Sequence, residues 1–77
     1  MDRIKKVISR VFDVDENNIH MNTMPDDISG WDSLGQMSLV MELEKEFSIE
    51  LEYEDIFKIM SVGDIYKVLR SKCIDGI

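Results

Sequence analysis

The 77-residue chain contains one cysteine, one histidine and one proline, and no apolar run approaches the roughly 20 residues that cross a membrane. Cys73 alone cannot form an internal disulfide, and the first residues lack the apolar stretch of a signal peptide. The zinc-binding patterns CxxC and HExxH are absent, and neither His20 nor Cys73 stands in a motif that supports nucleophilic catalysis. These absences predict a cytoplasmic protein that is not an enzyme and has no zinc site.

One acidic segment partly matches a calcium-binding loop. Asp13, Asp15 and Asn17 occupy the first three ligand positions of such a loop. The glycine position is filled by Asn18, and the twelfth position, which must supply a bidentate carboxylate, is Met24. The pattern therefore fails, and we expect no metal-binding residues.

Basic residues are also few, 9 against 16 acidic ones, so the formal net charge is −7. The shortage is concentrated in residues 13–55, where 13 acids and one base, Lys45, give a net charge of −12. An acidic surface repels nucleic acid and anionic membranes and favours basic protein partners. This segment is therefore either a solvated face that keeps the protein soluble or a docking surface, and charge alone does not decide between them.

The length predicts a single domain over residues 1–77, because common domains have about 100–150 residues. An apolar fraction of 44 % is that of a folded protein. The core must be small, because a chain of this size buries only about 60–65 % of its unfolded surface. We expect a folded monomer.

Helical spacing of apolar residues is the main pattern in the chain. It occurs over residues 2–12, 32–47, 53–59 and 62–72. In the short third segment we expect Ile56, Phe57 and Ile59 to point inward. Residues 61–64 are similar to a capping box, and residues 48–52 alternate like a strand that has no partner, so we expect an extended connector. The predicted fold is all-α: a small four-helix bundle of three main helices and one short helix, with a long loop after the first helix.

The connection at residues 13–31 is long for so small a protein, and loops of this length are usually functional. It collects polar turn residues and the single proline. Its apolar side chains, Ile19, Met21, Met24 and Ile28, follow neither helical nor strand spacing. We expect them to pin the connection to the core.

The helix predicted over residues 32–47 has an apolar arc wider than one neighbouring helix can cover. Part of that arc, Met37 and Met41, should therefore lie near the surface. Methionine fills cores, but it also adapts to several partners at docking surfaces. Both interpretations remain open from the spacing.

The start of this helix, Gly30-Trp31-Asp32-Ser33-Leu34, is the remaining candidate site. Asp and Ser are favoured N-caps, so the simplest interpretation is that Asp32 or Ser33 caps the helix. A helix start also presents free backbone N–H groups and the positive end of the helix dipole, which favour a phosphate. A serine phosphodiester would be well placed there.

Asp32-Ser33-Leu34, followed by an apolar helix that ends in Met41-Glu42-Leu43-Glu44-Lys45-Glu46-Phe47, resembles the acyl carrier protein family. The resemblance extends to the order of the helices and covers nearly the whole chain. In that family the serine of the Asp-Ser-Leu motif carries 4′-phosphopantetheine. The resemblance therefore implies that a transferase attaches this group from coenzyme A to Ser33, with Asp32 as its neighbour in the motif.

The resemblance also implies partners: a phosphopantetheinyl transferase, and acyl-loading and acyl-transferring enzymes with basic docking surfaces. On this chain Leu34, Met37 and Met41 would form the apolar centre of the docking face. Glu42 and Glu44 would steer the basic partners.

The chain departs from the family's usual pattern after the serine. Gly35 and Ser38 are neutral where carriers of fatty acid synthesis commonly have acids, and Lys45 reverses the charge. The run is more similar to stand-alone carriers of specialised pathways, such as surface polysaccharide or secondary metabolite assembly. Three alternatives remain: a fatty acid or other lipid pathway, an aminoacyl or peptidyl cargo, and an acidic helical interaction module without a prosthetic group.

Overall fold

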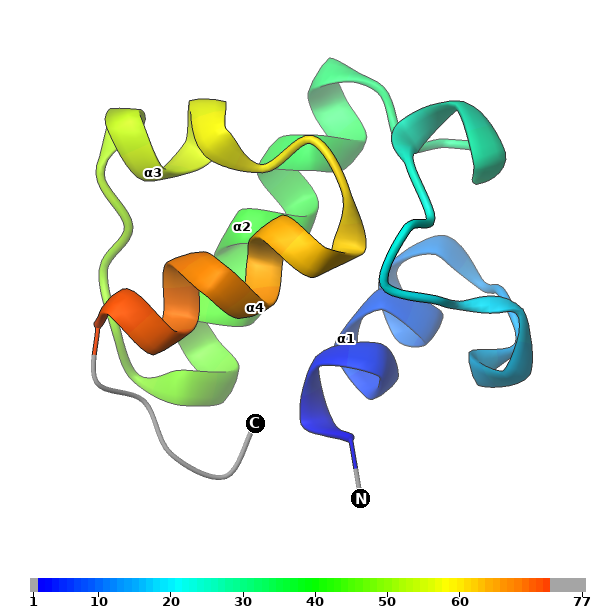
Figure 1. Ribbon diagram of the computed structural model, residues 1–77, viewed down its shortest axis with the longest axis horizontal. Helices are drawn as coiled ribbons and strands as arrows, with labels where there is room; N and C mark the ends of the chain where they lie inside the picture. The colour runs from blue at the N-terminus through cyan, green and yellow to red at the C-terminus, as the bar shows by residue number, and fades with distance from the viewer. Residues whose placement is uncertain (1, 73–77) are drawn as a thin grey trace.

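The computed structural model describes residues 2–72, and every regular element in that part of the chain is helical. The elements are helix α1 (Arg3–Phe12), 3₁₀ turns at Glu16–Asn18 and Pro25–Asp27, and helices α2 (Ser33–Phe47), α3 (Tyr53–Lys58) and α4 (Val62–Ser71) (Figure 1). The all-α prediction of three main helices and one short helix is confirmed. None of these helices is long and apolar enough to cross a membrane.

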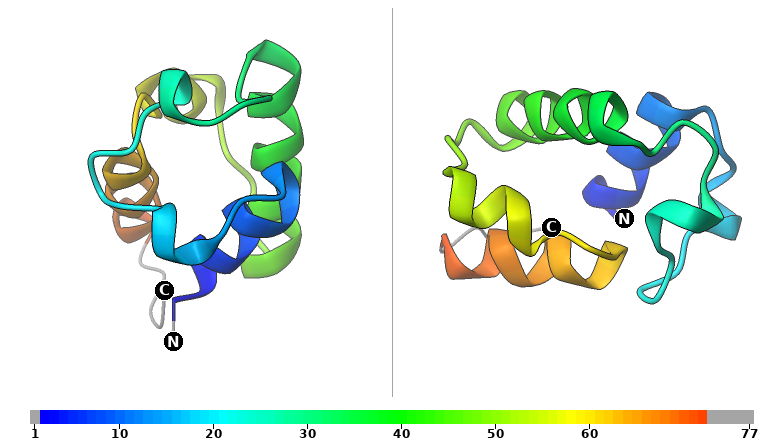
Figure 2. Two further views of the ribbon diagram at one scale, coloured as in Figure 1. Left: turned by 90° about the vertical axis from the view of Figure 1, so that its right-hand side faces the viewer. Right: turned by 90° about the horizontal axis from the view of Figure 1, so that it is seen from above.

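The core lies between the inward faces of α1, α2 and α4. Figure 2 shows α2 on one side of the bundle and α4 on the other, with the connection after α1 closing one end. The fully buried side chains are Ile4, Val7, Ile8, Ile19, Leu39, Leu43, Val62, Ile65 and Leu69. Burying one such side chain contributes about 1.5–3 kcal/mol, so this small set accounts for much of the hydrophobic stabilisation.

The long connection is pinned to the core, as expected, but not by all its apolar residues. Ile19, Ile28 and Trp31 are buried. Met21 and Met24 are about half exposed, so they do not serve as pins. The connection therefore follows the bundle surface and reaches inward at separate points.

Backbone hydrogen bonds tie the same connection to the start of α4. The Val62 N–H donates to the Thr23 carbonyl at 2.9 Å, and the Gly63 N–H donates to the Met21 carbonyl at 2.7 Å. The first N–H groups of a helix have no partner within the helix. Here the connection supplies their acceptors.

The N-caps of α1 and α4 explain where these helices begin. The Asp2 side chain accepts from the Lys5 N–H at 3.0 Å, and it also accepts a hydrogen bond from the Tyr66 hydroxyl of α4. The Ser61 hydroxyl accepts from the Asp64 N–H at 3.3 Å. The Asp64 carboxylate accepts from the N–H of Met60 rather than from that of Ser61, so the predicted capping box is displaced by one residue.

Helix α3 corrects one prediction about the core. Phe57 is 77 % exposed, not inward, and Tyr53 is 78 % exposed beside it. A helix of six residues makes fewer than two turns, and side chains four positions apart share one face. The opposite face points inward and is filled by buried Asp55, half-buried Ile56 and, just after the helix, buried Ile59.

Buried Asp55 contacts both the start of α3 and the end of α4. Its Oδ2 lies 2.8 Å from Lys72 Nζ and accepts from the Glu52 N–H at 3.1 Å. The Lys72 ammonium, and then the Glu52 N–H, hold the pKa of the Asp55 carboxyl below its usual value. The same contact raises the pKa of Lys72.

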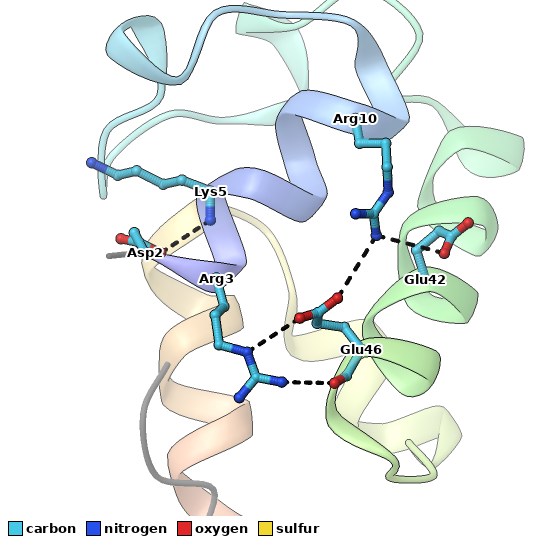
Figure 3. Close-up of polar contacts among 6 residues, drawn as sticks. All are labelled: Asp2, Arg3, Lys5, Arg10, Glu42 and Glu46. Atoms are coloured by element: carbon cyan, nitrogen blue, oxygen red, sulfur yellow. Dashed lines mark hydrogen bonds and ion pairs between the residues drawn. The ribbon is translucent and has the colours of Figure 1, made fainter.

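Ion pairs join α1 to α2 along one edge of the bundle (Figure 3). Arg3 Nε lies 3.2 Å from Glu46 Oε2, and Arg3 Nη2 donates to the Glu46 carbonyl at 2.8 Å. The Arg3 guanidinium also lies 4.5 Å from the centre of the Phe47 ring. Arg10 Nη2 lies 3.8 Å from Glu42 and 4.0 Å from Glu46. Two of the α2 acids are therefore paired within the chain.

Candidate functional site

The first turn of α2 decides which residue caps the helix. Asp32 has an extended backbone, and its Oδ1 accepts from the Gly35 N–H at 2.9 Å. The Asp32 carbonyl accepts from the Gln36 N–H at 2.7 Å. Asp32 is therefore the N-cap, and Ser33 is the first residue inside the helix. This frees the Ser33 hydroxyl from the capping role.

Ser33 is exposed, and its surroundings favour an anion. Within residues 2–72, neither the Ser33 hydroxyl nor the backbone N–H groups of Ser33 and Leu34 have a hydrogen-bond partner. These N–H groups lie at the positive end of a 15-residue helix. A hydroxyl beside two free donors is a suitable position for a phosphodiester.

A second serine, Ser61, stands at the start of α4 and provides a comparison within the same chain. Its hydroxyl caps the helix, and it is only partly exposed. The following N–H groups, those of Val62 and Gly63, are taken by carbonyls of the long connection. Within the part of the chain that the structure describes, the start at Ser33 is the one of these two whose donors are free for a ligand.

The turn that presents Ser33 is fixed from behind by aromatic packing. Trp31 is 5 % exposed and stacks on Phe12 of α1, with ring centroids 5.6 Å apart. Gly30 has a φ of +90°, a backbone conformation that residues other than glycine rarely adopt. The turn therefore enters α2 over the end of α1.

The same packing explains why residue 35 is a glycine. A Cβ at Gly35 would lie 1.9 Å from the Gly30 carbonyl oxygen and 2.9 Å from the Phe12 ring. No side chain fits there without moving the backbone. The missing acid at this position, one of the departures noted in the sequence, therefore has a steric cause.

The predicted apolar centre of the docking face is exposed. Leu34 is 81 % exposed, and Met37 and Met41 are about half exposed on the same helix. The sequence did not indicate that Tyr53 and Phe57 of α3 would continue this apolar surface. Aromatic residues four positions apart share one face of a helix, but this spacing does not say whether that face is buried or exposed. The packing of α3 shows that it is exposed.

A shallow groove of about 220 Å³ runs between α2 and α3. Its lining includes Met37, Met41, Leu51, Tyr53 and Ile56. The groove thus begins one turn after Ser33 and joins the apolar surfaces of the two helices.

The two predicted steering acids are both engaged within the protein. Glu42 pairs with Arg10, and Glu44 Oε2 accepts from the Leu51 N–H at 2.8 Å. This second bond holds the extended connector at residues 48–52, whose Ile49 and Leu51 are half-buried. Both acids therefore have structural contacts in addition to any contact with a partner.

The other candidate reactive residues of the sequence are His20 and Cys73. His20 is exposed in the long connection, and Cys73 lies outside the described residues. Within residues 2–72 no group of three or more His, Cys, Asp or Glu side chains could hold a metal ion.

Comparison with known proteins identifies the family of the chain. Residues 2–69 match the family described as the phosphopantetheine attachment site. The chain belongs to this family of phosphopantetheine-binding carriers, so it is a carrier rather than an enzyme, and its prosthetic group is 4′-phosphopantetheine. The alternative of an interaction module without a prosthetic group is thereby excluded.

Its relatives are acyl carrier proteins. The acyl carrier protein of Thermotoga maritima is 36 % identical over 70 residues, which are 91 % of this chain and 86 % of that protein. A solved structure described as an acyl carrier protein from Mycobacterium tuberculosis has a TM-score of 0.79 and 35 % identity, and the match covers 90 % of this chain and 92 % of that one. The protein therefore belongs to the acyl carrier protein family.

Proposed function

We propose that Ser33 is the residue to which 4′-phosphopantetheine is attached. The observation that carries this proposal is the contrast between the two helix starts. Among residues 2–72 the hydroxyl of exposed Ser33 and two N–H groups beside it have no partner, whereas at Ser61 the hydroxyl caps the helix and the next N–H groups are occupied.

The residues present fit the prosthetic group. The Ser33 hydroxyl oxygen would be joined covalently to the phosphate as a phosphodiester, and the N–H groups of Ser33 and Leu34 would stabilise the phosphate charge. Asp32 keeps the helix start in place through Gly35, so this donor pair is formed before any group is attached. When bound, 4′-phosphopantetheine supplies a terminal thiol that holds an acyl group as a thioester.

The proposed cargo is an acyl group, carried for a specialised pathway such as polysaccharide or secondary metabolite assembly. The neutral Ser38 and the basic Lys45 after Ser33 support this choice over housekeeping fatty acid synthesis, whereas the glycine at position 35 is explained by packing. An aminoacyl or peptidyl cargo is the second candidate. Mass spectrometry of the protein purified from its source would identify the cargo directly.

The proposed partners are a phosphopantetheinyl transferase and acyl-handling enzymes that dock on the exposed apolar surface of Leu34, Met37 and Met41. Glu42 and Glu44 are proposed to steer these enzymes from the same helix. A carrier works by raising the effective concentration of tethered cargo at each enzyme. We propose that it does so as a cytoplasmic monomer with a single domain over residues 1–77.

Intact-mass measurement tests the attachment residue. Incubation with coenzyme A and a broad-specificity transferase should add one phosphopantetheine to the wild type and none to Ser33→Ala. Ser38→Ala is the matched control, because Ser38 is exposed on the same helix, and it should be modified like the wild type. Modification of Ser33→Ala would refute the assignment.

A further inference from the structure

Gln36 lies one turn after Ser33 on α2, and its side chain joins three segments of the protein. Its Oε1 accepts from the indole N–H of Trp31 at 2.6 Å. Its Nε2 donates to the carbonyls of Ile56 and Ile59 at 3.2 and 3.4 Å. One amide thus connects the turn before Ser33 to the end of α3.

The chemistry of the partners fixes the orientation of this amide. An indole N–H only donates, and a backbone carbonyl only accepts. The amide oxygen must therefore face Trp31, and the amide nitrogen must face α3. Glutamate could still accept from Trp31 but, when ionised, has no donor for the two carbonyls.

Among the hydrogen bonds of residues 2–72, those of Gln36 are the ones that link α2 to the end of α3, beside the apolar packing of Ile59 in the core. Helix α3 has six residues, and the aromatic side chains of Tyr53 and Phe57 face solvent. The Ile56 carbonyl accepts from the Ile59 N–H at 3.2 Å. Gln36 adds a second donor to that carbonyl and also donates to the carbonyl of Ile59, the residue that ends the helix. The other polar anchor, between Asp55 and Lys72, attaches α3 to α4 instead.

We propose that Gln36 is a positioning residue that couples α3 to the turn presenting Ser33. Through it the attachment residue and the exposed aromatic face of Tyr53 and Phe57 reach a partner enzyme as one rigid surface. This inference rests on Ser33 being the attachment residue. The coupling itself concerns the unmodified protein and is measured separately.

Amide hydrogen exchange in the unmodified full chain tests the coupling. Trp31→Phe keeps a ring for stacking on Phe12 but removes the indole N–H, and it makes no change in α3. The amides of Ile56 and Ile59 should nevertheless exchange about fivefold faster, which corresponds to about 1 kcal/mol, the worth of one ordinary hydrogen bond. Gln36→Glu should accelerate them at least as much.

The double variant and a control separate coupling from general loosening. Trp31→Phe combined with Gln36→Glu should exchange no faster in α3 than Gln36→Glu alone, because both changes break one connection. Ser38→Ala should leave α3 unchanged. Unchanged α3 exchange in Trp31→Phe, or equal acceleration in α1 and α3, would overturn the proposal.

Steady-state kinetics with the transferase tests the consequence for presentation. In Gln36→Glu the KM for the carrier should rise about fivefold, because the transferase loses contacts that bind the ground state and the transition state equally. The kcat should stay the same, because the Ser33 hydroxyl is intact. An unchanged KM in a variant with accelerated α3 exchange would overturn the role in presentation. Failure of the wild type to be modified would instead contradict the assignment of Ser33, and the exchange data would still decide the coupling.

Discussion

The carbonyl oxygen of Gly30 lies 1.9 Å from the position that a Cβ on Gly35 would occupy. Replacing glycine by alanine inside a helix normally stabilises a protein by up to about 1 kcal/mol. Here the sign should reverse. We expect Gly35→Ala to lower the free energy of unfolding by about 2–3 kcal/mol, because overpacking must move the turn or the end of α1.

Chemical denaturation of Gly35→Ala beside Ser38→Ala measures this effect. Ser38 is exposed on the same helix, so its replacement by alanine should change stability by less than about 0.5 kcal/mol. An alanine at position 35 that leaves stability unchanged would show that the turn yields without cost.

Asp32 has a structural role that can be separated from its charge. Asparagine is as good an N-cap as aspartate, whereas alanine costs about 1 kcal/mol. We therefore expect Asp32→Asn to keep the stability of the wild type and Asp32→Ala to lose about 1 kcal/mol. If Asp32→Asn is stable but is modified slowly by the transferase, the carboxylate charge acts in the reaction itself.

The two arginines of α1 should differ in their contribution to stability. Arg3 donates to both the side chain and the backbone carbonyl of Glu46 and covers the Phe47 ring. We expect Arg3→Ala to cost about 1.5 kcal/mol. Arg10 makes longer and more exposed ion pairs, so Arg10→Ala should cost less than about 0.5 kcal/mol. Equal losses in thermal or chemical denaturation would contradict this difference.

Acid should weaken the attachment of α3 to α4 through Asp55. Its pKa is lowered in the folded protein by Lys72 and by the Glu52 N–H, so the charged form is favoured by folding. The stabilisation is complete above the ordinary aspartate pKa of about 4 and is lost as the pH falls through the lowered folded value. Asp55→Asn should therefore be less stable than the wild type at pH 7, and the difference should shrink by pH 3.

Denaturation curves at both pH values provide this comparison. Asp26→Asn is the matched control, because Asp26 is exposed in the long connection, and it should follow the wild type at both. A stability difference between wild type and Asp55→Asn that is the same at pH 7 and pH 3 would contradict the role of this ion pair.

The helices of the protein could be predicted because their apolar spacing reflects burial on one face. Helices α1 and α4 are capped by Asp2 and Ser61, whose side chains accept the hydrogen bonds that N-cap residues usually accept. Ser33 could be identified as a candidate attachment residue because it lies at a predicted helix start, which is a property of the local sequence. Local patterns of this kind are visible in one chain.

Contacts between helices could not be predicted in the same way. The sequence predicts Phe57 inward together with Ile56 and Ile59, but α3 is too short to bury both of its faces. The pairing of Glu42 with Arg10 depends on how α1 lies along α2. The steric need for Gly35 depends on a loop carbonyl, and no spacing rule reports such an approach.

The hydrogen bond from Tyr66 to Asp2 joins residues that are 64 positions apart in the chain. Closing so long a loop is entropically costly and comes late compared with local contacts. During synthesis α1 emerges before α4, so its capping residue gains its second partner only when Tyr66 has been made. The start of α1 is thus held by a residue synthesised 64 positions later, and its final contacts depend on the folding of α4.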